Sequence, residues 1–413
     1  MTHMREFRQK TIYDALGREP VHPFPARMAP GIALRVMSDI DKSRVLDPMV
    51  GSGTVLAVAR AQGHSGVGFD VDPLAVLISK VWTTAHDLDR IRDRAHQLLD
   101  DARSEFRNIT VGDAFPADAD EETCDFLRYW FDGYARRQLT ALSSKIHSIH
   151  CDITRDALWC AFSRLIISKQ SGASRAMDLS HSRPHRAFET APEKPFNKFL
   201  ASVERVIANV IDKRTRDRGP ETKIKRGDAR ELNLPDRSID LVLTSPPYLN
   251  AIDYVRCSKF SLVWMGHKIG DLRHVRSESV GTESASESPI DDDEEIQRVI
   301  DALNLRPKLE RRNERILGRY IDDMRSAISE VGRVLSKGGK AVYVVGENTL
   351  RGTYIRTSAI ITELAGLAGL SIAERRTRAL PANRRYMPPP STGYSGGAIE
   401  ARMRREIVLS FVK

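Results

Sequence analysis

Residues 243–248 read Leu-Thr-Ser-Pro-Pro-Tyr, and their side chains are the ones in this sequence best suited to chemistry. They follow an apolar run at 239–243 that predicts a buried strand. The two prolines stiffen the backbone and remove two N–H donors, so the turn offers carbonyl acceptors in a fixed geometry. Ser245 adds a hydroxyl, and Tyr248 adds a flat ring with a polar tip. Such a turn suits a planar base whose exocyclic amine is held by acceptors, and an ordinary Pro-Pro loop is the alternative.

A second motif lies nearer the start of the chain, where residues 45–54 read Val-Leu-Asp-Pro-Met-Val-Gly-Ser-Gly-Thr. A strand is predicted to end at the beginning of this motif, and a helix is predicted to begin at Thr54. Gly51 and Gly53 between them allow a tight turn and a close approach of the backbone to a ligand. Asp70 follows Gly51 by 19 residues. An acidic residue at about this spacing commonly binds ribose hydroxyls in nucleoside-binding α/β folds.

Together these motifs resemble those of the amino-methylating DNA methyltransferases, which use S-adenosylmethionine. Residues 47–54 look like the donor motif of that family, with Met49 in place of the common Phe. Residues 22–30 (His-Pro-Phe-Pro-Ala-Arg-Met-Ala-Pro) resemble the segment that seats the methionine end of the donor. Residues 227–229 (Gly-Asp-Ala) resemble the motif whose Asp contacts the donor adenine. The resemblance covers residues 20–80, 220–260 and 320–413.

The resemblance implies a set of site residues and a reaction. The donor-binding residues that it implies are Phe24, Pro25, Asp47, Pro48, Gly51, Ser52, Gly53, Thr54, Asp70, Asp228 and Ala229. The catalytic residues that it implies are Ser245, Pro246, Pro247 and Tyr248, and no metal is expected. The Ser-first form of the catalytic motif is associated chiefly with methylation of cytosine N4. Adenine N6 in DNA, a base amine in RNA, and a non-catalytic donor-binding scaffold remain as alternatives.

The expected mechanism needs no covalent intermediate. The lone pair of an aromatic amine is delocalised into its ring, so acceptors on its hydrogens must localise that lone pair before it can attack a methyl group. We assign this role to the Ser245 hydroxyl and the Pro246 carbonyl, with Tyr248 stacking on the base. Cys257 is interpreted as structural, because nothing beside it in the sequence marks an activated thiolate. The target base must leave the duplex by base flipping to reach such a turn.

Composition agrees with a nucleic-acid partner. The net charge of +9 and the isoelectric point of about 9.4 favour a polyanion, here double-stranded DNA. No membrane span or signal peptide is expected. The four cysteines form no Cys-x-x-Cys pair, which argues against zinc and for a reduced, cytoplasmic setting at the bacterial or archaeal nucleoid. A cognate restriction endonuclease acting on the same site and a homodimer are further partners that the resemblance allows.

The predicted fold is α/β, a Rossmann-like, mostly parallel seven-stranded sheet with helices on both faces and a largely helical insertion. Residues 1–82 are assigned to the donor-binding half and 219–263 to the catalytic half of the core. Residues 83–218 are assigned to the helical insertion, with helices at 87–106, 121–146, 153–168 and 197–213. A second insertion, at 264–315, is expected to be mobile or solvated over 277–295, which is rich in Ser, Glu and Asp. Residues 316–413 complete the core.

The reading of target DNA is assigned to the first insertion. Residues 163–186 mix Arg, Lys, His, Ser and Gln, which contact bases and phosphates, although a solvated loop would have the same composition. The basic runs at 213–218 and 311–315 are interpreted as solvated faces. Residues 384–390 could equally line the base pocket or form a polar loop.

Overall fold

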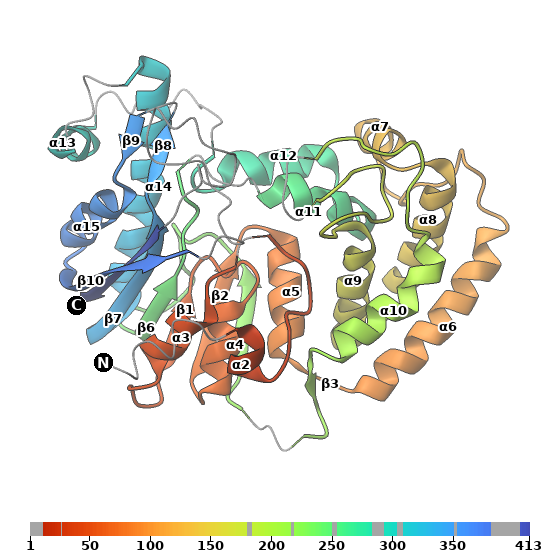
Figure 1. Cartoon of the computed structure of the whole chain (residues 1–413), viewed down its shortest axis with the longest axis horizontal. Helices are drawn as coiled ribbons and strands as arrows, with labels where there is room; N and C mark the ends of the chain where they lie inside the picture. The colour runs from red at the N-terminus through yellow and green to blue at the C-terminus, as the bar shows by residue number, and fades with distance from the viewer. Residues whose placement is uncertain are drawn as a thin grey trace.

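A seven-stranded sheet with the order β10-β11-β7-β6-β1-β2-β5 forms the centre of the protein (Figure 1). The computed structural model describes residues 11–25, 27–179, 184–215, 219–249, 254–282, 293–303, 309–350, 353–380 and 405–413. The strands are β1 (Arg44–Asp47), β2 (Ser65–Asp70), β5 (Thr222–Arg226), β6 (Ile239–Thr244), β7 (Leu335–Gly346), β10 (Ser371–Ala379) and β11 (Arg405–Val412). Strand β11 pairs antiparallel with both neighbours, and every other pairing in the sheet is parallel. The predicted mostly parallel sheet is therefore confirmed.

Helices cover both faces of the sheet because its central strands are apolar on both sides. Successive residues of a strand point to opposite faces. On β6, Leu241 and Leu243 pack with α3 (Pro30–Met37) and α4 (Thr54–Ala61). On the opposite face, Val242 packs with helices α14 (Arg311–Val334) and α15 (Thr357–Leu367). Such continuous apolar runs are typical of parallel strands buried on both faces.

Three helices of the second half of the chain lie on this opposite face. Helix α13 (Glu294–Ala302) packs on α14 (Arg311–Val334), which packs on α15 (Thr357–Leu367). The short α2 (Ile12–Leu16) lies by α3 and α4. Two further pairs of short strands, β3 (Ala85–His86) with β4 (Ile211–Asp212) and β8 (Asn348–Leu350) with β9 (Thr353–Ile355), stand apart from the main sheet.

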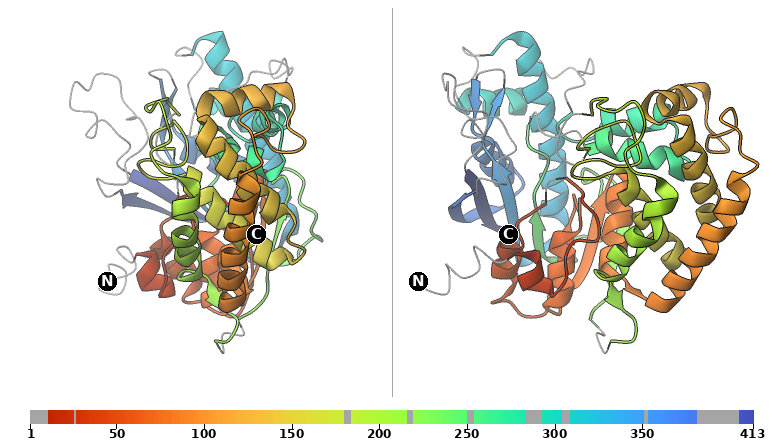
Figure 2. Two further views of the ribbon diagram at one scale, coloured as in Figure 1. Left: turned by 90° about the vertical axis from the view of Figure 1, so that its right-hand side faces the viewer. Right: turned by 45° about the vertical axis from the view of Figure 1, so that its right-hand side comes forward.

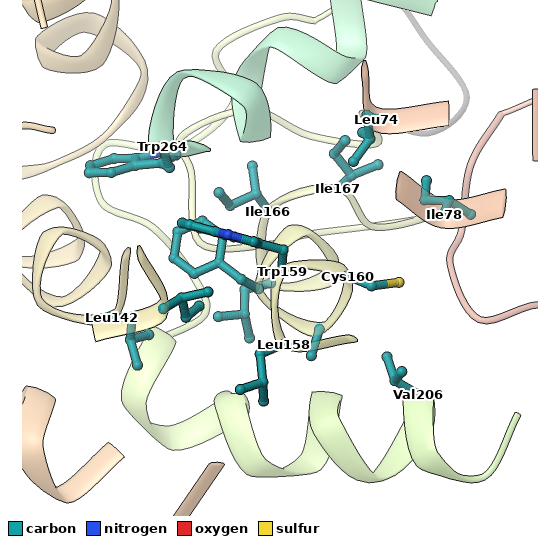
Figure 3. Close-up of a cluster of buried hydrophobic side chains, with 14 of the residues drawn as sticks. Leu74, Ile78, Leu142, Leu158, Trp159, Cys160, Ile166, Ile167, Val206 and Trp264 are labelled. Carbon is teal, nitrogen blue, oxygen red and sulfur yellow. The ribbon is translucent and has the colours of Figure 1, made fainter. Parts of the chain in front are cut away.

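The helical insertion lies beside the sheet and joins it through helix α5 (Pro73–Thr83), as Figures 1 and 2 show. Its helices are α6 (Leu88–Phe106), α7 (Glu121–Trp130), α8 (Gly133–His147), α9 (Asp152–Ile166) and α10 (Pro195–Ile207). One face of α5 contacts β5 and another contacts α9. Leu74 and Ile78 of α5 thereby enter the same apolar cluster as Leu158 and Val206 of the insertion (Figure 3).

A later segment of the chain completes the core of the insertion. Helix α11 (Tyr254–Leu262), the 3-10 turn η1 (Val263–Met265) and helix α12 (Ile269–Glu278) follow the catalytic turn in the sequence. Phe260 of α11 and Trp264 of η1 are fully buried in the cluster of the insertion helices. Figure 3 shows Trp264 with Trp159 and Ile166 of α9, which belong to the same cluster. The insertion core is thus built from two separate segments of the chain, one ending at Ile207 and the other beginning at Tyr254.

Several local predictions were wrong in their bounds. The single helix predicted at 121–146 is two helices, because Asp132 caps the second one by accepting from the amides of Tyr134 and Ala135. The helix predicted at 197–213 ends at Ile207, and β4 follows it. Residues 283–292 of the segment expected to be mobile, and residues 384–390, lie outside the described residues.

No helix in the described ranges is both long and apolar enough to cross a membrane. The four cysteines all lie in the described ranges and form no disulfide there, and Cys160 and Cys257 are buried.

The buried ring of Phe260 tests whether α11 stabilises the insertion. It makes edge-to-face contacts with Phe126 at 5.1 Å and Trp130 at 4.9 Å between ring centroids. We expect Phe260→Ala to lower the free energy of unfolding by about 3–5 kcal/mol in urea titrations, because a large cavity would remain. The control is Leu367→Ala on α15, a side chain that is 56% exposed, which we expect to change stability by less than about 0.5 kcal/mol. Equal effects of the two substitutions would contradict this account of α11.

Candidate active site

The glycine turn joins the carboxyl end of β1 to helix α4. Gly51 and Gly53 have φ values of +49° and +83°, which side chains other than that of glycine rarely allow. A Cβ on Gly53 would lie 3.0 Å from Ser79 of α5, so the turn and α5 are in close contact. A Cβ on Gly51 would meet no atom within 4 Å. The space beside Gly51 is therefore open to a ligand, as a donor-binding turn requires.

Asp47, at the end of β1, connects the glycine turn to the catalytic turn. Its carboxylate is 2% exposed and accepts hydrogen bonds from the Thr244 hydroxyl at 2.8 Å and the Met49 amide at 3.2 Å. Thr244 is the last residue of β6 and immediately precedes Ser245. Burial raises the pKa of Asp47 to about 7, although both hydrogen bonds act in the opposite direction. A single side chain thus fixes the ends of two adjacent strands against each other.

Asp70, at the end of β2, lies against the same glycine turn. One carboxylate oxygen accepts from the Gly51 amide at 2.8 Å, and the other accepts from the Asp72 amide at 2.9 Å. Burial and the neighbouring Asp72 charge raise the pKa of Asp70 to about 7. Each oxygen has a second lone pair, so this carboxylate can still accept from ribose hydroxyls.

The other predicted donor residues of this region are mostly buried. The hydroxyls of Ser52 and Thr54 lie 3.2 Å apart and hydrogen-bond each other. Pro48 and Pro25 are buried in their turns. Phe24 is 4% exposed, and its ring stacks on another aromatic ring close to Asp70.

Asp228 lies just beyond the carboxyl end of β5, next to the buried Ala229. Its two oxygens are bound by the Arg230 guanidinium at 2.6–3.1 Å. Arg230 also donates to Asp323 of α14 at 2.5 Å and to the Glu278 carbonyl of α12 at 2.7 Å. Arg230 was not among the residues predicted from the sequence. It binds the Asp228 carboxylate, which is the group expected to contact the donor adenine. Asp228 therefore helps to hold Arg230 between helices α12 and α14.

The catalytic turn is held at both of its ends. The Ser245 hydroxyl donates to the Val344 carbonyl of β7 at 3.0 Å. At the other end, the Asn348 side-chain amide donates to the Leu249 carbonyl at 2.5 Å. Asn348 is 3% exposed and had no recognisable signal in the sequence. The turn therefore depends on β7 and on the segment after it as well as on its own prolines.

The Tyr248 side chain is partly buried and packs against the apolar cluster of α14 and the sheet. Pro246 is buried and Pro247 is partly buried. Burial, with the carboxylate of Glu406 on β11, raises the pKa of Tyr248 well above its ordinary value. Its phenol is therefore protonated at neutral pH.

The sequence of the chain is similar to those of known methyltransferases. No family model matches the chain. The sequence is 24% identical over 382 residues to the Type II methyltransferase M.MvaI of Kocuria varians, covering 83% of this chain and 80% of that protein. It is also 24% identical over 254 residues to the Type II methyltransferase M.BsoBI of Geobacillus stearothermophilus, covering 56% of this chain and about half, 49%, of that protein.

The chain is similar to Type II methyltransferases. The likeness to M.MvaI extends along most of both chains. Together with the strand order, it supports the Rossmann-like methyltransferase fold that the motifs implied.

Solved structures resemble the chain more weakly. One is an S-adenosylmethionine-dependent methyltransferase from Methanosarcina mazei, with 9% identity, a TM-score of 0.33 and coverage of 92% of this chain and 96% of that chain. Another is a TehB-like S-adenosylmethionine-dependent methyltransferase from Corynebacterium glutamicum, with 10% identity, a TM-score of 0.30 and coverage of 100% and 98%. At these TM-scores, neither carries an argument about function.

The raised pKa of Asp47 makes stability depend on pH. Because the folded value of about 7 exceeds the ordinary 3.8, the folded protein binds more protons than the unfolded chain between these values. Stability from this group is complete below about pH 4 and is lost as the pH rises through 7. We expect Asp47→Asn, which keeps an acceptor for Thr244, to make the free energy of unfolding depend less steeply on pH. The slope of that free energy against pH should fall by at most ~1.4 kcal/mol per pH unit.

Urea titrations at pH 5, 6 and 7 measure this slope. The exposed Asp39→Asn serves as the control, and we expect it to leave the wild-type slope in place. An Asp47→Asn variant with the full wild-type slope would show that this carboxyl is not protonated in the folded protein.

Proposed function

We propose that this chain is an S-adenosylmethionine-dependent DNA methyltransferase that methylates the exocyclic N4 amine of a flipped-out cytosine. The observation that carries the proposal is the Asp47–Thr244 hydrogen bond of 2.8 Å, which sets the glycine turn and the Ser-Pro-Pro-Tyr turn side by side. The similarity to Type II methyltransferases supports the reaction class. The Ser-first form of the catalytic turn supports cytosine N4 over adenine N6.

The residues around the glycine turn fit such a donor. The open space at Gly51 leaves room against the backbone, and Asp70 retains acceptor capacity for ribose hydroxyls. We place Phe24 in the same site, because its ring stacks on that of Tyr254 and the charge of Asp70 helps to raise the pKa of Tyr254. Ser52 and Thr54 support the turn through their mutual hydrogen bond. We assign Asp228 and Ala229 to the adenine side of the donor, with Arg230 bound to the Asp228 carboxylate. When bound, S-adenosylmethionine supplies an electrophilic methyl group.

Ser245 is set to act as an acceptor. A hydroxyl has one proton and two lone pairs, and the Ser245 proton is directed to the Val344 carbonyl at 3.0 Å. The lone pairs can accept from one amine hydrogen of the base, and the Pro246 carbonyl can accept from the other. These contacts favour a tetrahedral nitrogen and localise its lone pair, so the amine becomes nucleophilic. Catalysis would then rest on positioning and electrostatics, and no step calls for a metal ion or a covalent intermediate.

We also propose that the insertion reads the DNA. Fewer side chains of residues 163–186 are available for this than the composition of that stretch indicates. Arg175 donates to the carbonyls of Arg128, Tyr129 and Glu189, so its guanidinium holds the loop together. Arg164 donates to a backbone carbonyl of the amino-terminal segment at 2.6 Å. Lys169 and Gln170 are exposed on the same loop, so they are the side chains that we expect to contact phosphates and bases.

The first test is single-molecule modification sequencing of DNA from cells that express the protein. We expect N4-methylcytosine at one recurring short motif, and none in cells that express Ser245→Ala, because the variant lacks the acceptor for the amine. The variant should still bind S-adenosylhomocysteine with wild-type affinity, since Ser245 does not line the glycine turn.

Each other outcome changes a specific part of the proposal. N6-methyladenine at the motif would keep the mechanism and overturn the choice of base. A mark that persists in Ser245→Ala would overturn the catalytic role of that hydroxyl. Absence of any DNA mark, with methylation of RNA instead, would overturn DNA as the substrate.

A further inference from the structure

Helix α11 connects the catalytic turn to the donor side of the core. It begins six residues after Tyr248 and packs on α5. The Ser258 hydroxyl of α11 donates to the Asp72 carboxylate at 2.5 Å, and both residues are almost fully buried. The Asp72 amide in turn donates to Asp70 at 2.9 Å. Through these bonds, one face of α11 is fixed against the carboxylate assigned to the donor ribose.

Tyr254 lies one helical turn before Ser258 and therefore on the same face of α11. Its ring stacks on Phe24, with a centroid distance of 5.9 Å and an interplanar angle of 10°. Burial, with the charge of Asp70, raises the pKa of Tyr254 to about 12. The phenol is thus a neutral hydrogen-bond donor near Asp70 and Phe24.

The Tyr254 hydroxyl is not used in holding the fold. Among the residues that the structure describes, it has no hydrogen-bond partner, whereas Ser258 on the same face is bonded to Asp72. Its side chain is only partly buried, so part of it remains accessible. A phenol with unused hydrogen-bonding capacity at this place is suited to a polar ligand.

We propose that Tyr254 is a donor-binding residue: its ring and that of Phe24 form one aromatic wall of the donor site, and its hydroxyl donates to a polar group of the donor between the ribose and the methionine end. This inference rests on the proposed function and adds to it a residue from the helix that follows the catalytic turn. It also makes α11 a shared support, because the same helix extends the catalytic turn and lines the donor.

Isothermal titration calorimetry of the full chain with S-adenosylhomocysteine tests this role. We expect Tyr254→Phe, which keeps the ring stacked on Phe24, to weaken binding by roughly threefold to tenfold, the usual worth of one hydrogen bond. Tyr254→Ala should weaken it further, because the wall is lost as well. The melting temperature of Tyr254→Phe should equal that of the wild type, since the hydroxyl makes no bond within the described chain.

The matched control is Tyr343→Phe. Tyr343 is a buried tyrosine of β7 whose hydroxyl also has no partner among the described residues, and it lies in the apolar cluster of the opposite face. Its substitution should leave donor affinity unchanged. Unchanged affinity in Tyr254→Phe, with normal binding by the wild type, would overturn the inference alone. Failure of the wild type to bind S-adenosylhomocysteine would overturn the proposed function instead.

Discussion

The hydrogen bond between Asp47 and Thr244 is the constraint on which the two functional turns depend. It lies between adjacent parallel strands, β1 and β6, at the carboxyl edge of the sheet, where α/β proteins place their ligands. Because the Asp47 carboxylate is 2% exposed, an unpaired partner here would leave a buried polar group without compensation. The glycine turn and the Ser-Pro-Pro-Tyr turn therefore have a fixed relation before any ligand binds.

The rest of the molecule keeps these turns in place from two sides. On one side, β7 and Asn348 hold the two ends of the catalytic turn through the Val344 carbonyl and the Leu249 carbonyl. On the other side, α11 leaves the same turn and buries Phe260 in the insertion core. The insertion is thus joined to the catalytic turn through the chain itself.

The sequence predicted the parts of the site that depend on local chemistry. The glycine turn was visible because positive φ values require Gly51 and Gly53, and the strands before both turns were visible as apolar runs. Strand β10 was missed because its residues are charged and mostly exposed at the edge of the sheet, where no apolar pattern is needed. Asn348 and Ser258 were missed because each acts on a partner about 100 residues or more away, and single-chain patterns report only local spacing.

Electrostatics explains why so many acidic side chains can gather at the donor side. Asp47, Asp70 and Asp72 lie within one region, and burial, with a smaller contribution from their mutual repulsion, raises the pKa of both Asp47 and Asp70 to about 7. Backbone amides of Gly51, Met49 and Asp72 offset part of this cost by donating to the carboxylates. A donor that carries a positive charge at sulfur would offset more of it, because a nearby cation favours the ionised carboxylates. The proposed donor site would therefore favour a cationic ligand over a neutral ligand of the same shape.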